Sequence, residues 1–137
     1  MPINLAVAAS IESVEPCEAW LTIDVEVRDY LVGIARRLNV PGIASLNRLD
    51  PWDDSELRGD DLEQLAAGLP MLRRRLTTAL ELQDLTPDMV PPDRVGFLDL
   101  AEGLPFGREG AMRLLVEMED LANRALRAGE CIVALGD

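Results

Sequence analysis

The residues with the most evident chemistry are seven carboxylates that lie close together in the middle of the chain. They are Asp50, Asp53, Asp54, Glu56, Asp60, Asp61 and Glu63, and we call residues 50–63 the acidic segment. A calcium-binding loop needs acidic or amide groups at alternating positions, a glycine sixth and a glutamate twelfth. With Asp54 placed first, Gly59 stands sixth, but Arg58 stands fifth and Leu65 twelfth. The acidic segment therefore does not match a calcium loop, and we expect no metal or other cofactor.

Paired carboxylates can also catalyse hydrolysis, as they do in glycosidases. Such a site needs two acids in one apolar cleft with separated pKa values. Only 4% of the residues are aromatic, so the chain offers no evident platform on which a sugar could stack. A carboxylate-dependent hydrolase is therefore an alternative interpretation, and we expect a protein that is not an enzyme.

The side chains that are missing exclude further chemistry. All thirteen basic residues are arginine, and the sequence has neither lysine nor histidine. Without lysine there is no Schiff base and no P-loop ammonium group. Without histidine there is no Ser–His or Cys–His nucleophile. Cys17 and Cys131 are too few for a zinc site and are expected to be reduced, buried thiols, unless the two chain ends meet and allow a disulfide.

The charge predicts the kind of partner. The formal net charge is −12, which repels nucleic acids and anionic lipid surfaces and favours basic proteins. The one basic cluster, Arg73 to Arg75, is expected on a solvated helix face, where it would pair with acids such as Glu81 or those of the acidic segment. No apolar run approaches the ~20 residues that span a bilayer, and no signal peptide is evident, so we expect a cytoplasmic protein with no membrane association.

A long amphipathic helix is predicted to begin near the end of the acidic segment. Six leucines spaced three or four residues apart fall on one side of a helix: Leu62, Leu65, Leu69, Leu72, Leu76 and Leu80. Asp60 and Glu63 fit a capping box at its start. Pro70, preceded by Gly68, should kink this helix, although two separate helices, one ending at Ala67 and one beginning at Pro70, remain the alternative.

A second amphipathic helix is predicted from Glu109 or Gly110 to Ala128. Its expected apolar face consists of Ala111, Leu115, Met118, Leu121, Ala122, Ala125 and Leu126. The continuous apolar run 131–135 that follows predicts a strand covered on both sides. Its candidate partners are 5–9, within an N-terminal segment that favours a strand, and 21–23.

The segment 19–27 fits both strand alternation and one face of a helix. We predict a helix from Val25 capped by Asp24, with 19–23 possible as an extended segment. A short helical turn or an extended piece is expected at 43–49. Prolines at 87, 91 and 92 interrupt regular structure, and we interpret 84–93 as a connection within one domain of 1–137. The predicted fold is mainly α (α+β), with two long amphipathic helices and a two- or three-stranded sheet that uses the C-terminal strand.

These observations favour a small acidic module that binds a basic protein. The predicted binding residues are Asp50, Trp52, Asp53, Asp54, Glu56, Asp60 and Asp61. Trp52 would be an exposed apolar anchor, or else a half-buried residue that packs against the helices. In size and charge alone the chain resembles bacterial immunity proteins and antitoxins, and also secretion chaperones. A structural subunit that forms a homodimer through the leucine stripe is the other alternative.

Overall fold

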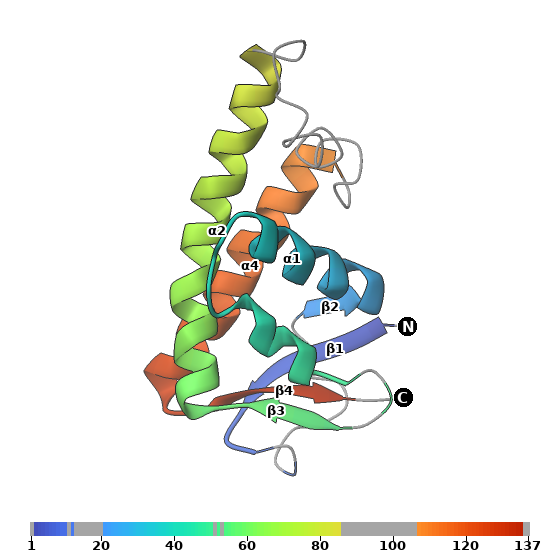
Figure 1. The fold of residues 1–137 in the computed structure, drawn as a ribbon. Helices are drawn as coiled ribbons and strands as arrows, with labels where there is room; N and C mark the ends of the chain where they lie inside the picture. The colour runs from blue at the N-terminus through green and yellow to red at the C-terminus, as the bar shows by residue number, and fades with distance from the viewer. Residues whose placement is uncertain are drawn as a thin grey trace.

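The computed structural model describes residues 2–10, 12, 21–50, 52, 54–85 and 107–135, with the backbone alone for 82–85. Its elements, in chain order, are strands β1 (Pro2–Ala8) and β2 (Leu21–Asp24), helix α1 (Val25–Arg37), the 3₁₀ helix η2 (Ile43–Arg48), strand β3 (Ser55–Leu57), helices α2 (Gly59–Leu85) and α4 (Gly107–Ala128), and strand β4 (Cys131–Leu135). The mainly helical α+β fold is confirmed, with the C-terminal strand in the sheet (Figure 1).

The four described strands form one antiparallel sheet in the order β2-β1-β4-β3. β4 lies between β1 and β3, and its residues Cys131 to Ala134 are buried, as the continuous apolar run predicted. The expected partner segment 5–9 corresponds to β1. The other candidate, 21–23, belongs to β2, which pairs with β1 instead of β4.

The helices cover one face of the sheet, and the core lies between them and that face (Figure 1). Alternate strand residues supply the sheet side of this core, among them Ile3, Leu5, Leu57 and Ile132. α2 and α4 run side by side, with apolar faces in contact. All six leucines of the predicted stripe are buried in this core, at 4% exposure or less.

α2 is one continuous helix that contains Pro70, so the alternative of two helices is wrong. Gly68, close to Pro70 on the same helix, allows a close contact with the loop before η2. A Cβ atom at Gly68 would collide with the backbone oxygen of Pro41, so the loop before η2 approaches α2 where the helix has no side chain. Gly42, in the same loop, has φ +91° and similarly leaves no room for a Cβ next to the backbone of Gln64.

The ambiguous segment 19–27 contains both predicted structures in succession. β2 ends at Asp24, and α1 begins at Val25 with Asp24 as its N-cap residue, as predicted. The Asp24 side chain accepts no capping hydrogen bond. The short turn expected at 43–49 is the 3₁₀ helix η2.

Several details differ from the sequence predictions. The sheet has a fourth strand, β3, within the acidic segment, because Leu57 enters the core and aligns Ser55 and Glu56 with β4. α2 begins at Gly59, so Asp60 lies in its first turn instead of before it. Leu126 is 37% exposed, so it does not belong to the buried face of α4. α2 extends through Leu85, so the connection predicted at 84–93 does not begin at residue 84. The rest of that segment, from 86 onward, lies outside the described residues, as does Cys17.

Candidate protein-binding surface

The exposed tryptophan is the most unusual surface feature of the acidic segment. Trp52 is 70% exposed, and the other large apolar side chains exposed within the described ranges, Val116 and Leu126, are smaller and less exposed. The sequence left open whether Trp52 would be half-buried or exposed, and the structure has it exposed. A tryptophan that stays in water in the free protein is the kind of residue that anchors protein interfaces.

Asp50 takes part in two hydrogen bonds near Trp52, one as acceptor and one as donor. The backbone N–H of Trp52 donates to Asp50 Oδ1 at 2.8 Å, and the backbone N–H of Asp50 donates to Ser55 Oγ at 3.1 Å. The first of these is an Asx-type bond, in which an Asp side chain accepts from the backbone two residues further on. Arg28, on α1, donates to the carbonyl oxygen of Leu49 at 2.5 Å and so ties the start of the loop to the helical layer. Asp54 is exposed in the same loop.

Glu56 is directed to the other face of the sheet, because alternate residues of a strand point to opposite sides. Its neighbour Leu57 enters the core, whereas Glu56 forms a salt bridge of 2.8 Å with Arg58 and lies 3.6 Å from Cys131 Sγ. The hydrogen bond with Glu56 and its negative charge raise the pKa of Arg58. Burial, and then the charge of Glu56, raise the pKa of Cys131, which is a free thiol.

The two aspartates at the start of α2 differ in their partners. Asp60 is exposed, and Asp61 forms a salt bridge of 2.9 Å with Arg48 of η2. Both are in the first turn, where negative charge is favourable beside the positive end of the helix dipole. Asp61 therefore already has a cationic neighbour within the chain.

The predicted binding residues therefore lie in different parts of the surface. Asp50, Trp52 and Asp54 lie together in one exposed loop, which we call the Trp52 loop. Glu56 is on the far face of the sheet beside Arg58, and Asp61 is paired with Arg48. Asp53 lies outside the described residues.

The basic cluster is largely solvent-exposed, as predicted, but its partners differ from the expected ones. Arg73 makes two hydrogen bonds to Glu119 of α4, Nε to Oε2 at 2.7 Å and Nη2 to Oε1 at 3.0 Å. Arg75 donates to the carbonyl oxygens of Leu38 and Asn39 after α1, at 2.7 and 2.8 Å. Arg74 is exposed. Two of the three arginines thus join helices instead of meeting Glu81 or the acidic segment.

Glu119 is a structural residue that sequence reasoning missed, although its position contains a signal. It stands four residues after Leu115 and three before Ala122, so helical spacing places it on the apolar face of α4. A carboxylate on such a face needs a partner, and Arg73 holds an equivalent position between Leu69 and Leu76 on α2. The hydrogen bond with Glu119 and its charge raise the pKa of Arg73.

The comparisons with known proteins identify no relative: no family model, no curated protein and no solved structure matches this chain. None of the helices in the described ranges is long and apolar enough to cross a membrane. No group of three or more Cys, Asp or Glu side chains that could hold a metal ion occurs among the residues that the structure describes. The geometry of the described residues is therefore the basis for any functional proposal.

Proposed function

We propose that this protein is a non-catalytic acidic module that binds a basic protein through the Trp52 loop. The observation that carries this proposal is the 70% exposure of Trp52, whose backbone N–H donates to Asp50 Oδ1. The backbone N–H of Asp50 in turn donates to Ser55 Oγ. Hydrogen bonds that the Trp52 and Asp50 backbone already makes in the free protein reduce the conformational freedom that a partner must restrict, which favours affinity. The tryptophan would supply the apolar anchor, and the aspartates beside it would meet cationic side chains.

The net charge of −12 supports the same proposal at longer range. A negative surface accelerates the encounter with a positively charged partner and discriminates against acidic ones, more than it adds affinity. Asp50, Asp54 and Asp60 are exposed, so they are accessible to such a partner. Neutralisation of a basic toxin, as by an immunity protein or an antitoxin, is one biological form of this interaction.

The leucine stripe is not available for the alternative of a homodimer. Its six leucines are buried within the chain, where they contact the sheet-facing core and α4. A seam between two copies would require the same atoms to be exposed. A homo-oligomer would have to use another surface.

The alternative of a carboxylate hydrolase has no specific observation in its favour. Within the described ranges Glu119 is the one buried carboxylate, and both of its oxygens accept hydrogen bonds from Arg73. A general acid or base needs an oxygen that can reach a substrate. The proposal of a binding module therefore takes precedence.

The proposal is tested by capture of partners from the source cell with three baits and one control in parallel. They are the unchanged protein, Trp52→Ala, and Asp50→Asn with Asp54→Asn. Asparagine at position 50 retains an oxygen that can accept the Trp52 N–H, so the loop geometry is preserved while charge is lost. The control, Glu81→Gln with Glu109→Gln, removes two exposed charges from the helices. We expect a basic protein bound by the control and the unchanged chain but not by the loop variants.

The captured protein is then purified and its affinity measured by calorimetry at several salt concentrations. We expect Trp52→Ala to weaken binding at least about 30-fold, which corresponds to the 2 kcal/mol of an interface hot spot. A partner that binds all four proteins equally well would exclude the Trp52 loop as the binding surface.

A further inference from the structure

A hollow with charges of opposite sign at its two ends lies between α4 and β2. The described residues that line it are Leu21 of β2 and Glu117, Asp120, Leu121 and Arg124 of α4, and its volume is about 220 Å³. β2 and β3 are at opposite edges of the sheet, so this hollow is separate from the Trp52 loop that precedes β3. The inference drawn from it does not depend on the proposed function.

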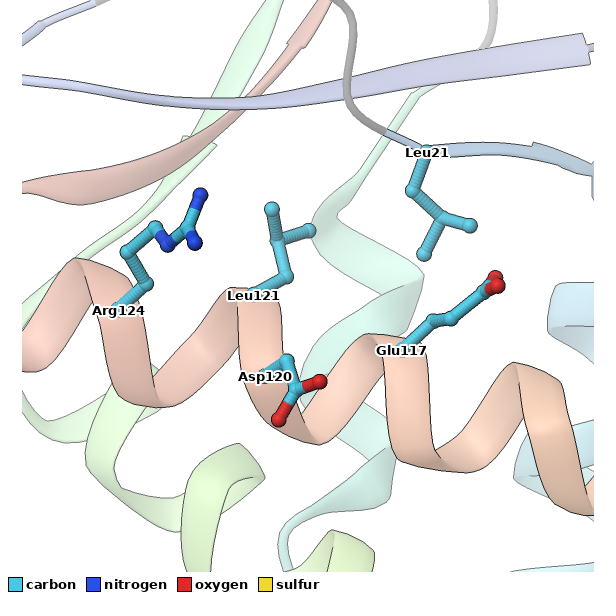
Figure 2. A pocket seen from close by; sticks show the side chains of 5 residues that line it. All are labelled: Leu21, Glu117, Asp120, Leu121 and Arg124. Carbon is cyan, nitrogen blue, oxygen red and sulfur yellow. The ribbon is translucent and has the colours of Figure 1, made fainter.

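The side chains divide the hollow into three parts (Figure 2). The Glu117 carboxylate lies beneath Leu21 at one end, Leu121 stands in the middle, and the Arg124 guanidinium rises at the other end (Figure 2). Asp120 also lines the hollow, and its side chain points away from Leu21 (Figure 2). Glu117, Leu121 and Arg124 therefore present an anion, an apolar group and a cation in this order along α4, with the carboxylate of Asp120 directed away from Leu21.

We propose that this hollow binds a small zwitterion whose ammonium and carboxylate groups are joined by an aliphatic chain, that is, an ω-amino acid. The ammonium group would meet Glu117, the carboxylate would meet Arg124, and the methylene groups would cover Leu21 and Leu121. Each charged end of the ligand faces an opposite charge, and its apolar centre faces apolar side chains.

The spacing along α4 selects the length of the ligand. Glu117 and Arg124 are seven residues apart, which separates their Cα atoms by about 10 Å at the helical rise of about 1.5 Å per residue. An α-amino acid, whose two charges share one carbon, is too short to reach both ends. The volume of about 220 Å³ is below the roughly 300 Å³ at which pockets for drug-sized molecules begin.

Arginine suits the carboxylate end for a geometric reason. Its guanidinium carries five N–H donors in a planar fork, so it can bind a ligand carboxylate while it keeps an interaction with the protein. Glu117 is exposed and belongs to the same helix as Arg124, so one rigid element sets the spacing of the two residues. Leu121, which lies between them on α4, is buried at 5% exposure.

The test is a titration of the full chain, labelled with ¹⁵N, with ε-aminocaproate. We expect saturable shifts centred on Leu21, Glu117, Leu121 and Arg124. Hexylamine and caproate each retain one charge and should bind at least about tenfold more weakly, since each loses a charge-assisted hydrogen bond. Equal binding of either one, or no saturable shift with ε-aminocaproate, would overturn the proposal. γ-Aminobutyrate tests length and should also bind more weakly.

Charge reversal provides a second, independent test. Glu117→Arg and Arg124→Glu should each weaken ε-aminocaproate binding at least about tenfold, and the double variant should restore it, because the zwitterion can bind in the reverse direction. The matched control, Glu63→Arg, changes an exposed acid of α2 and should leave the affinity unchanged. Failure of the double variant to recover, in a chain whose amide spectrum shows it to be folded, would exclude a two-ended site.

The same chemistry occurs at the C-terminal lysine of a peptide, whose side-chain ammonium and terminal carboxylate are similarly separated. Nα-acetyl-lysine distinguishes a free ω-amino acid from the C-terminal lysine of a peptide as the ligand. Weaker binding of this compound than of ε-aminocaproate assigns the hollow to a free ω-amino acid, as we propose. Tighter binding would overturn that assignment in favour of a peptide C-terminus.

Discussion

Two glycines inside helices have opposite surroundings, although a sequence pattern treats them alike. A Cβ atom at Gly33 of α1 would meet nothing within 4 Å, whereas one at Gly68 of α2 would collide with the backbone oxygen of Pro41. Gly33→Ala should therefore raise the free energy of unfolding by about 0.5–1 kcal/mol, through the helix propensity of alanine. Gly68→Ala should lower it by about 2 kcal/mol, since the 41–42 loop must move. Urea unfolding of both variants measures the difference, and equal effects would contradict the close approach at Gly68.

The ion pair between α2 and α4 is expected to contribute mainly through the cost of breaking it. Glu119 is 8% exposed, and Arg73 satisfies both of its oxygens. Arg73→Met leaves a buried carboxylate without its partner and should reduce the free energy of unfolding by about 2 kcal/mol. Arg74→Met, at the exposed neighbouring position, should change it by less than about 0.5 kcal/mol.

The double variant Arg73→Met with Glu119→Met separates the cost of leaving Glu119 unpaired from the net contribution of the ion pair to the free energy of unfolding. It should recover most of the loss, because an apolar pair leaves no unsatisfied charge in the interface between the helices. Chemical denaturation of the three variants under one set of conditions is sufficient. A double variant as unstable as Arg73→Met alone would show that the pair is worth more than its desolvation cost.

The buried thiol predicts a loss of stability at alkaline pH. Burial and the charge of Glu56 raise the pKa of Cys131 from its ordinary value of 9.0. In the unfolded chain the thiol ionises first, so above that value the unfolded state binds fewer protons and stability falls as pH rises, until the folded thiol also ionises. Cys131→Ala should show a weaker decline between about pH 8 and 10. Tyr30, whose pKa burial also raises, is present in both proteins and cancels in the comparison.

At the scale of secondary structure, long periodic segments and one continuous apolar run were predictable, whereas β3 was not. The leucine stripe and the apolar face of α4 repeat often enough to identify both helices, and the apolar run 131–135 identified the buried C-terminal strand. β3 has three residues and no period, and it forms because Leu57 reaches the core beside β4. The Trp52 loop was located by composition, but its exposure depends on tertiary packing that no local pattern contains.

Pro70 tests how much α2 depends on its surroundings. Proline inside a helix removes one backbone hydrogen bond and crowds the preceding turn, yet α2 continues from Gly59 to Leu85. The buried leucines on both sides of Pro70 offset this cost by holding the two halves in one register. Pro70→Ala should therefore raise the free energy of unfolding by about 1 kcal/mol, measurable as a higher urea midpoint. A lower midpoint would mean that the loop containing Pro41 needs the geometry that the proline imposes.

At the scale of the whole molecule, the charge of −12 predicts that salt acts in opposite directions on folding and on binding. In the free protein the carboxylates repel one another, and salt screens this repulsion, with a Debye length that falls from about 30 Å at 0.01 M to about 10 Å at 0.1 M. The thermal midpoint of the free chain should therefore rise across this range.

If the proposed basic partner binds at the Trp52 loop, the same screening removes attraction between the two proteins, so the complex should weaken as salt increases. Asp50→Asn with Asp54→Asn should reduce both dependences, whereas Trp52→Ala should weaken the complex and leave its salt slope unchanged, because that side chain contributes apolar contact and no charge. Calorimetric titrations and thermal scans in the same buffers measure both quantities, and a complex whose affinity is independent of salt would exclude electrostatic attraction as the basis of recognition.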